Sequence, residues 1–229
     1  MIEFLAALAL FLISHSIPAR PRVRAGLVER LGERGYILGY SALSLALLAW
    51  LLSAASRAPF VPLWDLAIWQ YHIPIALMLP AFLLFAGGAV CPNPLSISFS
   101  RFRFDPDRPG IVAITRHPIL WGFALWSFAH VVPNGDLVSV VMFGGFGSFA
   151  LLAMPIVDRR KRRALGASWH DLANRTSLVP FSAVAAGRTG MVWRTPQLVA
   201  TLTIGAGLYA ALLWLHPWLF GPDPKLAFG

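Results

Sequence analysis

Two of the six histidines in this sequence stand beside arginines at the ends of apolar segments. His15 closes the first apolar stretch and precedes Arg20, and His117 follows directly on Arg116. A neutral imidazole is the commonest metal ligand in proteins and an axial ligand of haem iron. A neighbouring guanidinium can pair with the carboxylates of a bound group. These two places in the chain are therefore the first candidates for chemistry.

The segments that carry these histidines have the composition of a membrane protein. Of the 229 residues, 57% are hydrophobic and 13% are charged, which is more apolar than a soluble domain with a solvated surface. A helix needs about 20 mostly apolar residues to cross the hydrocarbon core. Residues 66–100 and 195–222 contain no Asp, Glu, Lys or Arg and are longer than that. We expect an all-α, polytopic helix bundle.

The hydropathy pattern predicts about six transmembrane helices in a single domain covering residues 1–229. The first apolar segment is interpreted as a retained span rather than a secretory signal, because Glu3 comes before it and the basic residues come after it. The six predicted spans are Met1–Ile17, Tyr36–Ala55, Tyr71–Val90, His117–Val132, Leu137–Val157 and Pro196–Phe220.

The basic residues fall almost entirely in alternate connections between these spans. The first, third and fifth connections share one face of the membrane and hold 17 of the 19 lysines and arginines, all except Arg57 and Lys225. The positive-inside rule places that face in the cytoplasm and both termini on the opposite side. The net charge of +9 is thereby explained, so we expect anionic lipid rather than nucleic acid as the partner of the basic residues.

This topology brings His15 and His117 to the same depth, at the cytoplasmic ends of the first and fourth spans, where they can share a ligand. His130 cannot bind the same ion, because thirteen residues of straight helix give a displacement of about 20 Å and a rotation of roughly 220°. His72 and His216 fall near the outer boundaries of their spans.

Haem fits two such histidines better than zinc does. A zinc site needs about four ligands, often with cysteine or carboxylate, whereas haem iron takes one or two protein ligands. The propionates of haem can pair with Arg20 or Arg116. A small residue such as Gly122 lets a flat macrocycle approach the backbone, although small residues also serve plain helix packing. His170 lies in a cytoplasmic loop and is given no role.

Several motifs carry a family resemblance. They are residues 110–130 (GIVAITRHPILWGFALWSFAH) followed by Asn134-Gly135-Asp136, His15-Ser16 ahead of the first arginines, Asn93-Pro94, and residues 175–181 (RTSLVPF) with Gly187-Arg188. Together they resemble the NnrU family of membrane proteins, which includes the 15-cis-zeta-carotene isomerases of plants and cyanobacteria. The resemblance is strongest over residues 10–190.

The resemblance implies a haem b protein with His15 and His117 at the positions of the isomerases' two haem ligands. His130 also matches a family histidine, which implies a distal or substrate-side role. The isomerases flip a central cis double bond of zeta-carotene when reduced haem frees a ligand position. Bacterial NnrU proteins are instead associated with denitrification, and Ala58-Pro59, Asn93-Pro94 and Asn134-Gly135-Asp136 resemble that branch. We therefore expect a protein of the bacterial inner membrane that acts on a lipophilic polyene or a small nitrogen oxide.

Two alternatives stay open at this stage. A membrane methyltransferase that uses S-adenosylmethionine would share the Arg116-His117-Pro118 motif with Gly122 four residues later, but Val157-Asp158 and Ser177 stand where such enzymes have paired glutamates and an arginine. The other alternative is an accessory or haem-handling factor for nitrite or nitric oxide reductase activity, with a membrane reductase complex as its partner.

Overall fold

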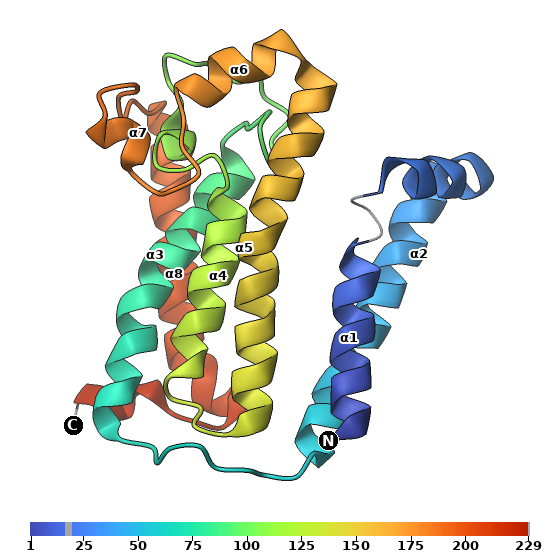
Figure 1. Ribbon diagram of the computed structural model, residues 1–229. Helices are drawn as coiled ribbons and strands as arrows, with labels where there is room; N and C mark the ends of the chain where they lie inside the picture. Colours follow the sequence, from blue (N-terminus) through green and yellow to red (C-terminus); the bar gives the residue numbers. More distant parts are fainter. Residues whose placement is uncertain (17–19, 229) are drawn as a thin grey trace. The chain divides into compact units, whose positions relative to one another are not determined.

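A computed structural model describes residues 1–16 and 20–228 (Figure 1). Every regular element among them is a helix, apart from one isolated bridge between Pro62 and Asp136, so the all-α prediction is confirmed. The residues form two compact units. Unit 1 consists of Met1–Asp65 and Gly135–Gly145, and unit 2 of Leu66–Asn134 and Phe146–Gly229. The single domain stays a prediction.

Among the residues that the structure describes, four helices are long and apolar enough to cross a membrane, which indicates a multi-pass membrane protein. They are α2 (Pro21–Arg57), α3 (His72–Val90) extended by η2 (Ile68–Tyr71), α5 (Leu137–Leu165) and α8 (Thr195–Phe220). Two shorter apolar helices, α1 (Ile2–Ser16) and α4 (Pro118–Val131), coincide with the other two predicted spans. Ile17, the end of the first predicted span, lies outside the described residues. Six crossings and the orientation of the termini stay predictions.

Prolines set several of the helix ends. Pro21, Pro118 and Pro196 stand in the first turns of α2, α4 and α8. Backbone N–H groups in a first turn have no acceptor within the helix, so the N–H that proline lacks is not needed there. Ala58 and Cys91 cap the ends of α2 and α3 in extended conformation. Each of them precedes a proline, which disfavours the helical region for the residue before it.

Unit 1 is built on the pairing of α1 with α2. Glu3 accepts hydrogen bonds from Arg57 Nη2 at 2.6 Å and from Trp50 Nε1 at 3.1 Å, which ties the start of α1 to the end of α2. Phe4 and Leu51 are fully buried between the two helices. The two helices therefore run antiparallel.

The helix α2 changes direction at Gly32, which has φ 71° and ψ 163°, a conformation that glycine adopts without steric cost. Arg24 bridges this turn: its Nη2 lies 2.6 Å from Glu33 Oε1, and its guanidinium lies 5.4 Å from the centre of the Tyr36 ring. The second predicted span begins just after this turn, at Tyr36. Residues 21–31 form a separate, basic helical segment.

Unit 2 is organised around α3, which packs against both α4 and α8. Glycines make these approaches close. A Cβ atom on Gly88 would lie 2.6 Å from Ile119 Cγ1, and one on Gly205 would lie 2.8 Å from Leu83 Cδ2. The helices α4 and α8 thus pack closely on α3, and a larger side chain at Gly88 or Gly205 would push the helices apart.

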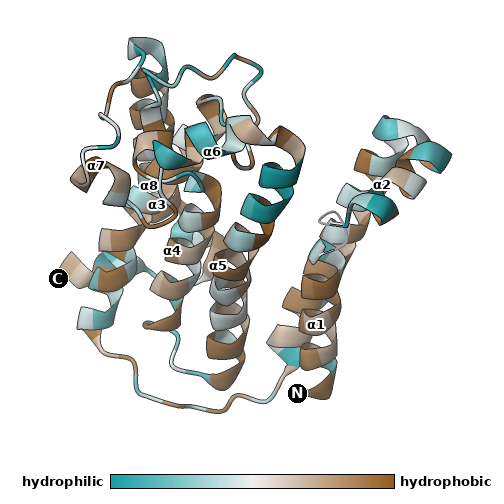
Figure 2. Ribbon diagram, turned by 45° about the horizontal axis from the view of Figure 1, so that its top comes forward, coloured by the Kyte–Doolittle hydropathy of each residue, from teal (hydrophilic) through white to brown (hydrophobic). Residues whose placement is uncertain are grey.

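The helix α5 continues two turns beyond its predicted end at Val157 and includes the basic run of residues 159–163. Arginine and lysine are good helix formers, so the change from apolar to charged residues does not end the helix. Figure 2 shows this change as hydrophilic last turns on a hydrophobic helix. Gly166, with φ 58°, ends it. The remaining elements of unit 2 are α6 (Ala167–Asn174), α7 (Ser182–Ala185), η3 (Gly110–Ala113) and η4 (Pro224–Phe228).

Candidate functional site

His117 lies in unit 2 at the N-cap of α4, and its side chain is fully buried. Its Nδ1 is 2.7 Å from Ser96 Oγ, in the segment that follows α3. Its Nε2 is 3.0 Å from Asp158 Oδ1, near the end of the apolar part of α5. Both ring nitrogens therefore have hydrogen-bond partners within the protein.

The backbone around His117 is held by segments far apart in sequence. Asn93 donates from Nδ2 to the Arg116 carbonyl oxygen at 2.9 Å. The Arg116 N–H donates to the Ser177 carbonyl at 2.9 Å, and Thr115 Oγ1 donates to the Leu178 carbonyl at 3.0 Å. Three of the motifs that carry the family resemblance, Asn93-Pro94, residues 110–130 and residues 175–181, thus meet around His117.

Two further motif residues brace the same region. Trp121 donates from Nε1 to the Leu178 carbonyl at 2.8 Å. Arg188 donates from Nη1 to the carbonyl oxygens of Asn174, at 2.6 Å, and Thr176, at 3.1 Å. These carbonyls lie at the end of α6, where helical acceptors lack partners, so Arg188 stabilises the turn that leads into residues 175–181.

Arg116 lies beside the same carboxylate. Its Nε is 3.7 Å from Asp158 Oδ2 and has no hydrogen-bond partner in the described part of the chain. Its guanidinium lies 5.8 Å from the centre of the Trp169 ring. Burial lowers the pKa of Arg116, and the negative charge of Asp158 opposes that effect. Asp158 is therefore shared between a buried imidazole and a mostly buried arginine.

His15 lies in unit 1, in the last turn of α1, and is half-buried. Its Nδ1 is 2.7 Å from the Phe11 carbonyl oxygen, and its ring lies 4.1 Å from the Phe11 ring and 6.0 Å from the Tyr40 ring. Arg20 is exposed at the N-cap of α2. Because His15 and His117 belong to different units, a ligand common to both stays a prediction.

The other expected cofactor contacts lie elsewhere in unit 2. A Cβ on Gly122 would lie 3.1 Å from the Ala81 carbonyl oxygen and from the Phe85 ring, so this glycine faces α3. His130 lies near the end of α4, and its ring centre is 6.5 Å from that of His216 on α8. Sequence reasoning placed His216 near the outer boundary of its span and His130 far from His117 along the fourth span, but it did not pair the two.

Two partners of His117 were also missed. Ser96 gave no signal in the sequence beyond its proximity to Asn93-Pro94. Asp158 was considered only as the residue that stands in place of a methyltransferase glutamate. Its position as the one carboxylate at the junction of an apolar span and a basic run could have indicated a buried partner, because an ionisable group at that depth needs one.

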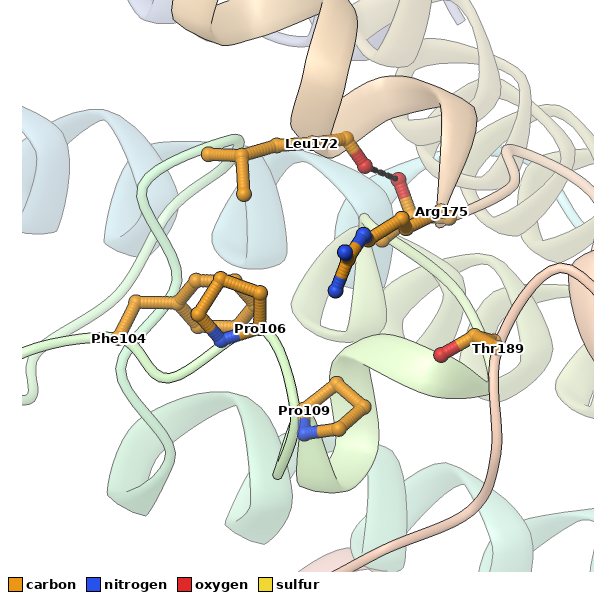
Figure 3. A pocket seen from close by; sticks show the side chains of 7 residues that line it. Phe104, Pro106, Pro109, Leu172, Arg175 and Thr189 are labelled. Carbon is orange, nitrogen blue, oxygen red and sulfur yellow. Dashed lines mark hydrogen bonds between the residues drawn. The ribbon is translucent and has the colours of Figure 1, made fainter.

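A shallow groove lies on the loops of unit 2 near α6. Figure 3 shows Phe104, Pro106 and Pro109 facing Leu172 and Arg175 across it. The adjoining hollow, lined also by Asp107 and Asp171, has a volume of about 260 Å³. No histidine lines either part, so the groove is separate from the expected haem ligands.

Comparison with known proteins gives a family. The family described as NnrU protein matches residues 3–224. The chain belongs to the NnrU family. This NnrU protein is 35% identical to the 15-cis-zeta-carotene isomerase, chloroplastic, of Zea mays over 121 residues, which are 48% of this chain and 33% of that protein. It is 31% identical to the corresponding protein of Arabidopsis thaliana over 125 residues, 51% of this chain and 32% of that protein.

The resemblance seen in the motifs is thereby confirmed. The match spans about a third of the length of these NnrU relatives, so their activity is a proposal for this chain. No solved structure matches it.

The two expected haem ligands differ in how well they fit that role. The Phe11 carbonyl can only accept a hydrogen bond, so a neutral His15 ring carries its proton on Nδ1 and its lone pair on Nε2. His15 therefore fits an axial ligand as it lies. His117 can act as an axial ligand only after Ser96 or Asp158 gives up its hydrogen bond to one of the ring nitrogens. Asp158, whose side chain is 17% exposed, is the partner nearer the surface.

Proposed function

We propose that this NnrU protein binds haem b through His15 and His117 and acts on a lipophilic polyene, as a cis–trans isomerase of a zeta-carotene-like molecule. The observation that supports the proposal is that three of the family motifs meet around His117, whose ring nitrogens contact Ser96 and Asp158. The similarity of half of the chain to proteins named zeta-carotene isomerases supports the choice of substrate class.

The chain's own residues would hold the ligand histidines in defined tautomers. Asp158 would release His117 Nε2, and the Nδ1–H would then donate to Ser96 Oγ, which lies 2.7 Å away. The released carboxylate has a second partner nearby, because its Oδ2 is already 3.7 Å from Arg116 Nε. A neutral imidazole with its second nitrogen hydrogen-bonded is the form that ligates a metal.

Haem would supply an iron centre whose oxidation state and axial ligation can change. Arg20 and Arg116 would pair with its propionates from the cytoplasmic side. His130, which lies thirteen residues after His117, would face the substrate rather than the iron.

We further propose six membrane crossings in a bacterial inner membrane, with both termini on the non-cytoplasmic side. The support is that the two short apolar helices coincide with predicted spans and that the basic residues alternate between connections. Fluorescent-protein fusions at each terminus test this. Fluorescence of both fusions from the cytoplasm would refute the orientation.

An absorption spectrum of the detergent-extracted protein, before and after dithionite, tests the cofactor. We expect a Soret band that is strongly reduced in His15→Ala and His117→Ala and unchanged in the control His170→Ala, whose ring is exposed on α6. Full haem content in both ligand variants would refute the assignment of the ligands.

A second assay addresses the reaction. The reduced, haem-loaded protein is mixed with 15-cis-zeta-carotene, and the isomers are separated by chromatography. Haem binding without turnover would refute the isomerase and leave the accessory role in denitrification, which is then tested by reductase maturation in a deletion strain.

A further inference from the structure

The connection between α3 and α4 carries three phenylalanines, and two of them are exposed. Residues 99–104 have the sequence FSRFRF. Phe99 is 73% exposed and Phe102 is 74% exposed. Phe104, in contrast, is half-buried and packs against the core cluster that contains Cys91. The rings of Phe99 and Phe102 therefore lie outside the packed core of unit 2.

These exposed rings begin at the end of a candidate membrane span. Cys91 caps α3, and its carbonyl oxygen accepts a hydrogen bond from Ser98 Oγ at 3.1 Å. Phe99 therefore follows a residue that is tied to the end of α3. A chain spans at most about 3.6 Å per residue, so the backbone of Phe102 lies within about 11 Å of that of Phe99. Because α3 is long and apolar enough to cross a membrane, we expect both rings at the edge of the bilayer.

The arginines beside these rings are not paired within the protein. Arg101 and Arg103 are exposed, and neither side chain forms an ion pair or a hydrogen bond within the described part of the chain. The next carboxylates along the chain, Asp105 and Asp107, each form an ion pair of 3.1 Å with an arginine of another segment. Residues 99–103 therefore keep two positive charges that no ion pair among the described residues neutralises.

Exposed aromatic rings next to unpaired arginines suit the surface of a membrane. In segments that lie on a bilayer, apolar side chains enter the boundary between headgroups and acyl chains, and basic side chains bind anionic lipids. A guanidinium can bind phosphate oxygens through two parallel hydrogen bonds. An acidic protein would also attract the arginines, but the position of the segment at the end of α3 favours lipid.

We propose that residues 99–103 anchor unit 2 to the membrane surface. Phe99 and Phe102 insert their rings into the boundary between headgroups and acyl chains, and Arg101 and Arg103 bind the phosphates of anionic phospholipids. This anchor does not depend on the proposed haem site.

The insertion is tested with the full-length protein in nanodiscs that contain phosphatidylglycerol. The variant Phe102→Cys is labelled with the fluorophore NBD, and the control His170→Cys is labelled at an exposed position of α6. The wild type, whose Cys91 is buried, gives the background. We expect blue-shifted emission from Phe102→Cys, with quenching by lipids that carry bromine in their acyl chains, and neither effect in His170→Cys.

The arginines are tested in the labelled Phe102→Cys protein. Adding Arg101→Gln and Arg103→Gln should reduce the quenching, and replacing phosphatidylglycerol by phosphatidylcholine should reduce it as well. The control Lys225→Gln should leave the quenching unchanged. Lys225 lies on η4, which packs against η2 at the opposite end of α3.

Each result decides the proposal. Unquenched emission from Phe102→Cys would overturn the insertion and leave the surface to a protein partner. Equally strong quenching in His170→Cys would overturn it too, because contact with lipid would then not be specific to residues 99–103. Equal quenching in the two lipids, with no effect of the arginine changes, would overturn the binding of lipid phosphate.

Discussion

Replacing Asp158 by alanine should destabilise unit 2 markedly. The change leaves His117 Nε2 without its acceptor in a side chain with no exposed surface. A buried donor deprived of its partner costs about 1–3 kcal/mol. Loss of the longer pairing with Arg116, across 3.7 Å and partly open to solvent, adds at most about 1 kcal/mol. We therefore expect a loss of about 1–4 kcal/mol.

Two variants set the scale for this measurement. Ser96→Ala removes a neutral hydroxyl from the other ring nitrogen and should cost about 0.5–1.5 kcal/mol. Asp171→Ala removes an exposed carboxylate from α6 and should change stability by less than about 0.5 kcal/mol. The free energy of unfolding is measured in mixed micelles by circular dichroism during denaturant titration.

The order of these effects is the decisive result. An Asp158→Ala variant as stable as Asp171→Ala would refute the pairing of Asp158 with His117. The proposed function adds a condition, because haem binding to His117 would displace Asp158. The destabilisation caused by Asp158→Ala should therefore be smaller in haem-loaded protein than in haem-free protein.

Three further predictions use the packing and backbone of the same chain. Gly205→Ala should lower the free energy of unfolding by about 1–3 kcal/mol, because its Cβ would meet Leu83 of α3. The control Gly207→Ala, whose Cβ would have nothing within 4 Å, should leave the protein as stable or make it more stable in the same unfolding assay. Equal effects of the two variants would contradict the close approach of α8 to α3. Cys91 is 1% exposed, and burial raises its pKa, so less thiolate exists at any given pH and maleimide labelling at pH 8 should be slow until the protein unfolds. Rapid labelling of the folded protein would show that Cys91 is accessible. Phe181 has φ 64°, a left-handed conformation that costs a non-glycine residue about 1 kcal/mol. Asparagine tolerates this conformation better, so Phe181→Asn should raise the midpoint of thermal unfolding. A lower midpoint would show that the Phe181 ring contributes more to stability than the backbone strain costs.

The helices could be predicted from the sequence because their signals are local. Apolar runs and prolines in the first turns locate α3, α4 and α8 within a residue or two. The basic run after Val157 was expected to end a span, but helix propensity continues through arginine and lysine, so α5 ends only at Gly166.

The partners of the histidines could not be predicted in the same way. The contact between His117 and Asp158 joins α4 to α5, and the pair of His130 and His216 joins α4 to α8. Such contacts depend on the rotation of each helix about its axis, and the nearly uniform hydrophobicity of a membrane helix does not specify this rotation. The motifs predicted the family correctly, but the meeting of three of them around His117 required the fold.

The bridge that Arg24 forms across the turn at Gly32 gives the basic segment of residues 21–31 a defined shape. The arginines of this segment lie on a helix that is already formed, not on an extended loop. A partner that docks there would not have to order the chain first, and so would avoid the entropic loss that weakens recognition of disordered segments. A partner that binds this segment can therefore recognise the orientation of its helix as well as its charge.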